Sequence, residues 1–300
     1  MPPLALPTPL VSTSWLADHL HDRGVKVVDA SSWLPTAGRD ARAEYETAHI
    51  PGAVFADIDR LSDEDSPLPH TLLDPARFGE RIGELGISND DAIVVYDASG
   101  QNFSAPRLWW MLRTFGHERV AVLDGGLRRW TMDGRAVERG RVGVSPVHFE
   151  ARLDASRVRD LTAMRASLER SGEGREQVVD ARSPGRFAAT EPEPRPGVRG
   201  GHVPGSHSLH YASLVRDDGT LRPPEELRAL AAEAGLDLSR PIVASCGSGV
   251  TACAVVLALD SLGVRAAVYD GSWTEWGGRR DTPVETGAPP ARHPRADPGA

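Results

Sequence analysis

Two cysteines, Cys246 and Cys253, are the only thiols in this chain of 300 residues. Cys246 follows an apolar run and precedes a glycine-rich turn that leads into an apolar segment of helical length. The turn consists of Gly247, Ser248, Gly249, Val250 and Thr251. A turn of this kind before a helix directs successive backbone N–H groups at one point, which stabilises a thiolate, the nucleophilic form of cysteine. The pattern predicts a nucleophilic Cys246, and the alternative is a buried cysteine in a tight turn.

The surroundings of Cys253 predict a different role. It lies inside the apolar segment, among alanine and valine residues, where a cysteine packs as a small apolar side chain. At the rise of a helix the two cysteines lie about 10 Å apart, too far for a disulfide. We therefore expect two free thiols, of which only Cys246 is reactive.

The elements that position Cys246 become visible when the sequence is compared with itself. Four segments recur in the same order and at a nearly constant spacing, at 28–30 and 179–181, 49–52 and 202–205, 93–97 and 242–246, and 122–126 and 268–272. The chain is therefore predicted to contain two copies of one domain. His49 and His202 open the second of these segments in both copies, including the copy without a cysteine, so we expect them to be structural.

Each copy alternates short β-branched runs with segments of helical length, which is typical of a parallel sheet flanked by helices. The predicted fold class is α/β, with two tandem domains. We expect a first, non-catalytic domain over residues 8–140, a linker over 141–158 and a second, catalytic domain over 159–285. The tail over 286–300 is rich in proline and poor in apolar residues, so we expect it to be disordered.

The amino-acid composition disfavours several classes of binding partner. The net charge of −8 disfavours nucleic acid, because a polyanion needs a basic surface. The first ten residues lack a basic segment followed by a long apolar core, and no apolar run approaches the roughly 20 residues that span a bilayer. We expect a cytoplasmic protein without membrane contact. No Cys/His spacing resembles a zinc site and no glycine-rich nucleotide motif follows a strand, so we expect no metal and no cofactor.

The Cys246 turn, the duplicated domain and the two His-hydrophobic-Pro-Gly motifs at 49–52 and 202–205 together resemble the two-domain rhodanese superfamily of sulfurtransferases. The resemblance covers nearly the whole chain. It implies that the second domain carries the catalytic cysteine, that the first has lost it, and that the active site lies between them. Asp97, at the position that matches Cys246, fits such an inactive copy.

The residues after the cysteine divide this family. Its thiosulfate sulfurtransferases place Arg and Lys there, whereas its 3-mercaptopyruvate sulfurtransferases place Gly and Ser, as Gly247 and Ser248 do here. A neutral loop also offers less to a doubly charged anion. The resemblance therefore favours 3-mercaptopyruvate as the donor. A thiosulfate sulfurtransferase, which makes thiocyanate and sulfite, stays open as the alternative.

The resemblance assigns two further groups of residues. Arg186 and Arg195 match a pair of arginines that holds the carboxylate and keto group of the donor. Asp59, His70 and Ser248 match a triad in which the aspartate orients the histidine and the histidine polarises the serine hydroxyl. The alternatives are exposed arginines in a proline-rich loop and a solvent-facing His70. If the arginine pair is not the clamp, Arg107 and Arg113 of the first domain are the next candidates.

The expected reaction passes sulfane sulfur from a small-molecule donor through a Cys246 persulfide, with release of pyruvate. A second thiol, such as thioredoxin or a small thiol, or cyanide, accepts the sulfur, and N–H groups of Gly247, Gly249, Val250 and Thr251 hold the sulfur anion. Two rivals belong to other classes. A cysteine-loop phosphatase needs an arginine where this chain has Ala252. A noncatalytic sulfur-carrier module needs no donor clamp.

Overall fold

The computed structural model describes residues 6–170 and 175–287, which form two five-stranded parallel sheets. The first sheet has the order β1-β5-β4-β2-β3 and the second has the order β6-β10-β9-β7-β8. The two orders are identical when strands are matched along the chain, which confirms the predicted duplication and the α/β class. The strands are β1 (Leu10–Val11), β2 (Val25–Asp29), β3 (Val54–Phe55), β4 (Ala92–Tyr96), β5 (Val120–Leu123), β6 (Val158–Arg159), β7 (Gln177–Asp180), β8 (His207–Ser208), β9 (Ile242–Ser245) and β10 (Ala266–Tyr269).

Helices cover both faces of each sheet because alternate residues of a buried strand point to opposite sides. In β4, Ile93 and Val95 pack into one apolar cluster, and Val94 and Tyr96 pack into another. The helices of the first half are α1 (Thr13–His19), α2 (Ala41–Thr47), α3 (Pro75–Glu84), α4 (Ala105–Thr114) and α5 (Gly126–Met132). Those of the second half are α6 (Leu161–Glu169), α7 (Pro184–Ala188), α8 (Pro224–Glu233), α9 (Ala252–Ser261) and α10 (Ser272–Gly278). None of the helices in these described ranges is long and apolar enough to cross a membrane.

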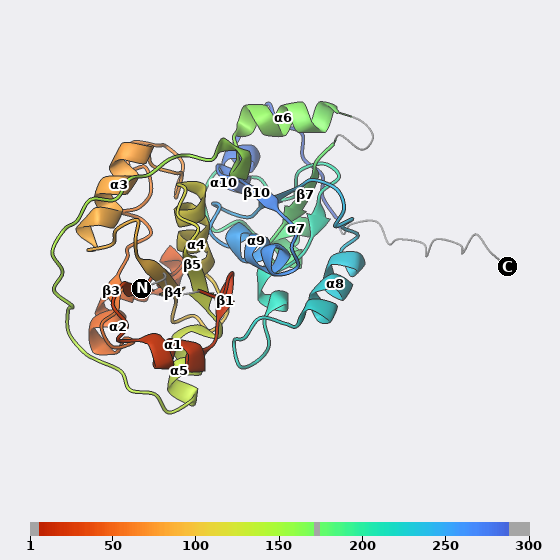
Figure 1. Ribbon diagram of the computed structural model, residues 1–300. Helices are drawn as coiled ribbons and strands as arrows, with labels where there is room; N and C mark the ends of the chain where they lie inside the picture. The colour runs from red at the N-terminus through yellow and green to blue at the C-terminus, as the bar shows by residue number, and fades with distance from the viewer. Residues whose placement is uncertain (1–5, 171–174, 288–300) are drawn as a thin grey trace.

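The two halves meet at α4 and α9, which lie side by side between the sheets (Figure 1). Both helices are almost entirely buried, and their side chains belong to one apolar cluster. Each half also binds a loop of the other: the N–H of Leu72 donates to Asp270 at 2.8 Å, and the N–H of Leu221 donates to Asp124 at 2.7 Å. This seam (the contact between α4 and α9 with the two reciprocal loops) joins the halves through apolar and polar contacts.

The segment between the two sheets packs against the first half, around whose outer side it runs in Figure 1. The N–H of Val147 donates to the carbonyl of Gly83 on α3 at 3.0 Å. A Cβ atom at Gly79, one turn earlier, would lie 2.5 Å from the carbonyl oxygen of Phe149. The two glycines therefore let the segment lie directly on the helix backbone.

Two expected boundaries need a correction. Val158 was expected to end the linker but lies in β6, where it pairs with Val268 of the second sheet. The expected disordered tail begins at 286, yet the N–H of Gly287 donates to the carbonyl of Ala188 at 3.0 Å. Both differences arise because backbone hydrogen bonding in the second half begins earlier and ends later along the chain than the apolar pattern of the sequence does. The remainder of the tail, 288–300, lies outside the described residues.

Candidate active site

Cys246 directly follows β9 and is 2% exposed. Its carbonyl accepts from the N–H of Trp273 at 2.9 Å, and its N–H donates to the hydroxyl of Ser272 at 3.2 Å. The carbonyl of Gly247 accepts from the backbone N–H of Thr274 at 2.9 Å and from its hydroxyl at 2.6 Å. The turn after β10 thus fixes the backbone on both sides of the Cys246–Gly247 bond.

Residues 247–251 (the thiolate loop) connect Cys246 to the buried helix α9. Among the described residues, none accepts a hydrogen bond from a backbone N–H group of this loop. Gly249 has φ +79°, and a Cβ atom there would lie 3.1 Å from Arg107, so glycine is required. The loop therefore offers free backbone donors at the start of a helix, which suits a sulfur anion.

The first half has a different group at the matching place. Asp97 follows β4 as Cys246 follows β9, and one of its carboxylate oxygens accepts from the N–H groups of Ser104 and Ala105 at 3.0 and 2.9 Å. The other oxygen accepts from the N–H of Ser99 at 2.9 Å. The donors at the start of α4 are thus already used by a carboxylate of the chain itself, so they are not available to a bound anion.

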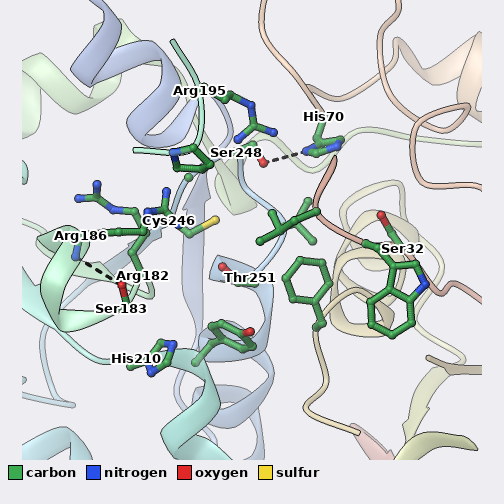
Figure 2. Close-up of a pocket in the computed structure, with 17 residues that line it drawn as sticks. Ser32, His70, Arg182, Ser183, Arg186, Arg195, His210, Cys246, Ser248 and Thr251 are labelled. Carbon is green, nitrogen blue, oxygen red and sulfur yellow. Dashed lines mark hydrogen bonds between the residues drawn. The ribbon is translucent and has the colours of Figure 1, made fainter. Parts of the chain in front are cut away.

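Arg186 and Arg195 (the arginine pair) both line a cavity of about 250 Å³ above the thiolate loop. Figure 2 shows the sulfur of Cys246 directed into this cavity, with Arg186 on one side and Arg195 above it. Arg186 lies in the short helix α7, which Ser183 caps by accepting from the N–H of Arg186. Arg195 lies in the proline-rich loop that follows. The structure therefore brings both predicted arginines to the cysteine.

Arg186 is held by Glu193, whose side chain is 4% exposed. The guanidinium donates to Glu193 at 2.6 and 3.2 Å. Arg182, which is fully buried, binds Glu193 at 2.7 Å and Asp180 at 2.6 Å. Arg186 thus pairs with Glu193 inside the cavity wall and not on an exposed surface loop, and this pairing orients Arg186.

Arg195 differs from Arg186 because, within residues 6–170 and 175–287, no carboxylate lies at ion-pair distance from it. Burial lowers the pKa of the Arg195 guanidinium, and the adjacent Cys246 opposes that shift. An arginine remains protonated in proteins, so Arg195 is a positive charge available to a ligand.

Asp59, His70 and Ser248 are brought together across the seam. The Nδ1 atom of His70 lies 2.8 Å from the Ser248 hydroxyl, and Nε2 lies 3.0 Å from Asp59. Ser248 is buried, His70 is 17% exposed and Asp59 is 77% exposed. The hydrogen bond with His70 lowers the pKa of Asp59 below its usual range. The arrangement lets a proton reach or leave the serine hydroxyl through one imidazole.

An apolar part of the cavity lining comes mainly from the first half. It is formed by Trp33, Leu34 and Phe103, with Tyr211 of the second half. The edge of the Phe103 ring meets Tyr211 at a centroid distance of 5.9 Å. A ligand in this cavity therefore meets both arginines and aromatic rings.

The remaining candidates are placed away from the cavity. Burial raises the pKa of Cys253 to about 12, and its thiol donates to the carbonyl of Gly249 at 3.2 Å, in keeping with inert packing. His49 and His202 are buried and contact the backbone carbonyls of Tyr45 and Phe187. Both cysteines are free.

Arg107 and Arg113, the fallback candidates for the clamp, do not line the cavity. Arg107 is buried in the seam, and Arg113 is paired with Glu118 and Asp260. Within the described ranges, no group of three or more His, Cys, Asp and Glu side chains could hold a metal ion.

Sequence reasoning missed Arg182, Glu193 and His210. A comparison of the repeats offered a signal for Arg182. The matching position in the first half, which has no cysteine, holds Ser31, so the arginine is specific to the half that carries Cys246. His210 lines the cavity, and burial lowers its pKa. Nothing in the local sequence of His210 or Glu193 distinguishes them from residues of an exposed loop.

Comparison with known proteins gives concordant results. The family profile described as "Rhodanese-like domain" matches residues 12–133 and 165–279. The 3-mercaptopyruvate sulfurtransferase of Mus musculus is 46% identical over 273 residues, 89% of this chain and 91% of that protein. The thiosulfate sulfurtransferase of Cricetulus griseus is 43% identical over 274 residues, 89% of this chain and 91% of that protein. The crystal structure of SseA from Escherichia coli, described as a 3-mercaptopyruvate sulfotransferase, superposes with a TM-score of 0.80 at 42% identity, over 89% of this chain and 99% of that one.

Proposed function

The chain belongs to the rhodanese-like domain family, with one copy of the domain in each half, and we infer that it is a sulfurtransferase that uses 3-mercaptopyruvate as its donor. The observation that carries the donor assignment is the place of Gly247. A Cβ atom there would lie 3.0 Å from Nη2 of Arg186 and 3.8 Å from Nη1 of Arg195. A larger residue at 247 would displace the arginine pair, and a basic residue would also repel it. The chain thus keeps both guanidinium groups available by leaving this position empty.

The charges around the sulfur favour a donor with one negative charge. Arg182, Arg186 and Arg195 contribute three positive charges, and Asp180 and Glu193 neutralise two of them. The Cys246 thiolate balances the third. A monoanion such as 3-mercaptopyruvate then adds a single charge, whereas thiosulfate adds two, which costs more in a half-buried site.

In the first step, the Cys246 thiolate attacks the sulfur of 3-mercaptopyruvate. The new S–S bond forms as the C–S bond of the donor breaks, and the electron pair of that bond moves to carbon as the enolate of pyruvate. Arg186 and Arg195 hold the carboxylate and keto oxygen, where the enolate charge develops. Ser248 gives its proton to the enolate carbon and recovers one through His70, which Asp59 orients.

In the second step, the acceptor, a thiolate or cyanide, attacks the outer sulfur of the Cys246 persulfide. The S–S bond to Cys246 breaks, the acceptor carries the sulfur away, and the Cys246 thiolate is regenerated within the thiolate loop. Thioredoxin, a small thiol or cyanide are the acceptors that we propose, with cyanide giving thiocyanate. A cytoplasmic location stays a prediction.

The donor assignment is tested by steady-state kinetics with 3-mercaptopyruvate and with thiosulfate, using cyanide as the acceptor in both assays. We expect a higher kcat/KM for 3-mercaptopyruvate, measured as pyruvate release. Cys246→Ser is the blank, because it removes the nucleophile and leaves the fold intact. A higher kcat/KM for thiosulfate would make the chain a thiosulfate sulfurtransferase instead.

A further inference from the structure

Arg107 is a fully buried charge that the reaction described above does not use. It lies in the first turn of α4, and its guanidinium points across the seam. Nη2 donates to the backbone carbonyl of His70 and to Asp270, the latter at 3.0 Å. Nη1 donates to the backbone carbonyl of Gly249 at 3.3 Å. The guanidinium lies 4.6 Å from the ring centroid of Trp110.

Arg107 binds one backbone carbonyl in each half of the protein, next to the two side chains that contact each other across the seam. One is that of His70, in the first half. The other is that of Gly249, the residue next to Ser248, in the second half. The hydrogen bond between His70 and Ser248 spans 178 positions of sequence, and one guanidinium binds the backbone on both sides of it.

The backbone of His70 needs to be held. Its φ of 61° lies in the left-handed region, which a histidine adopts rarely and which its surroundings must enforce. Two residues later, the N–H of Leu72 donates to Asp270 at 2.8 Å, and Asp270 also binds Arg107. The chain is thus fixed on both sides of Thr71 by a single Arg107–Asp270 pair.

We propose that Arg107 is a positioning residue that sets the contact between His70 and Ser248 across the seam. The proposal rests on the proposed function, because the contact matters only if His70 acts on Ser248 during sulfur transfer. A lysine cannot replace Arg107, because its donors all lie on one atom, whereas the guanidinium distributes them over a planar fork that reaches three acceptors.

The test is a double-mutant cycle between Arg107→Lys and His70→Ala. The readout is the single-turnover rate of product release at saturating donor, divided by the amount of Cys246 that an alkylating reagent titrates. This division removes any loss of reduced Cys246, and circular dichroism of each variant measures the folded fraction. The donor concentration that gives half the maximal rate is measured in parallel. It should not change, because the arginine pair that binds the donor lies in the second half, away from α4.

Arg113→Lys is the matched control. Arg113 lies on the same helix, spans the same seam to Asp260 at 2.7 Å, and lies 5.0 Å from the ring centroid of Trp109. Its ion-pair partners do not line the cavity. If loss of any ion-paired arginine of the seam slowed the reaction, this variant would be slow as well.

We expect Arg107→Lys to slow product release by about 10- to 100-fold, as displacements near 1 Å do at reacting groups. In the His70→Ala background, Arg107→Lys should slow product release by less than about threefold, because the residue through which Arg107 acts is absent. An equal loss in both backgrounds, or a rate within about threefold of the wild type, overturns the proposal. If Arg107→Lys does not fold, Arg107→Gln enters the same cycle.

The wild-type rates with 3-mercaptopyruvate and thiosulfate are measured first, and the cycle itself uses 3-mercaptopyruvate, because only this donor leaves an enolate that Ser248 protonates. A preference for thiosulfate then refutes the donor assignment without affecting the cycle. An additive cycle refutes the role of Arg107 without affecting the donor assignment.

Discussion

Replacing each member of the arginine pair by alanine separates donor binding from the general reactivity of the cysteine. Each change removes one charge-assisted contact to the donor, worth roughly 1.5–3 kcal/mol, which corresponds to about 10- to 150-fold in kcat/KM for 3-mercaptopyruvate. The two variants should not be equal. Arg195 has no carboxylate at ion-pair distance in the described part of the chain, so Arg195→Ala removes only its own contact.

Arg186→Ala should be the more damaging change. It leaves Glu193, whose side chain is 4% exposed, with Arg182 as its remaining ion-pair partner. The partly compensated carboxylate then faces the carboxylate of the donor and repels it. We therefore expect the loss for Arg186→Ala at the upper end of the range, and partial recovery when Glu193→Gln is added. Arg186→Lys should recover little, because an ammonium cannot bind Glu193 and a donor carboxylate with the same geometry.

The assay is pyruvate release at a fixed concentration of a thiol acceptor. The internal control is alkylation of Cys246 by a neutral reagent, at the pH of the turnover assay. We expect the alkylation rate to change by less than about threefold, because a neutral reagent forms no ion pair with the arginines. Near-normal kcat/KM in both alanine variants would refute the clamp, and equal losses in turnover and alkylation would assign the arginines to the thiolate instead.

Four further predictions concern the nucleophile, the donor preference and the stability of the fold. Cys246→Ser should abolish sulfur transfer and Cys253→Ser should preserve most of it; mass spectrometry after donor addition should find one extra sulfur on the Cys246 peptide, and its presence on Cys253 alone contradicts the assignment. Gly247→Arg should lower kcat/KM for 3-mercaptopyruvate relative to thiosulfate, because it crowds the arginine pair with a third positive charge, and an unchanged ratio contradicts this reasoning. Burial raises the pKa of Asp29 from 3.8 to about 6, so its stabilising effect is complete below its unfolded pKa and disappears as the pH rises through about 6. The Asp29→Asn variant lacks this titration. The difference in free energy of unfolding between the variant and the wild type should therefore shift in favour of the variant by about 2–3 kcal/mol as the pH rises from about 4 to 8. A difference that does not change with pH would contradict that pKa. Gly83→Ala, which helix propensity alone predicts to stabilise by about 1 kcal/mol, should instead destabilise by about 1–3 kcal/mol in denaturant titrations, because its Cβ atom meets the carbonyl of Val147.

The fold and the cysteine loop were predictable because their signals are local or repeated. The repeated segments align two sheets of the same order, and the helix over 75–84 begins where Asp74 accepts from the N–H of Arg77, with proline at its first position. Alternating apolar runs and capping residues act within a few positions of each other. Reasoning from the sequence therefore reached the position of Cys246 without knowledge of the other half.

The site across the seam was not predictable from local pattern. Asp59 and His70 lie in a polar loop whose residues could equally face solvent, and only the packing of α4 on α9 brings them to Ser248. Arg107 did carry a signal, because it is a lone charge in the apolar segment over 105–112. A buried arginine needs several acceptors, but the sequence does not say which carbonyls supply them.

The two halves differ where their parallel strands end, which is where open α/β sheets bind ligands. In the second half Asp180 pairs with Arg182, and the loop donors after β9 are free. In the first half Ser31 replaces that arginine, and Asp97 uses the loop donors itself. The first copy thereby lost the means to bind an anion but kept its fold. It then supplies what the cysteine loop lacks, namely the imidazole of His70, its orienting carboxylate, and most of the apolar wall. The proposed reaction needs a free thiolate at Cys246 and a proton relay to the enolate carbon, and these two parts would be divided between two copies of one domain. In that mechanism the seam between the copies is as important as the nucleophile.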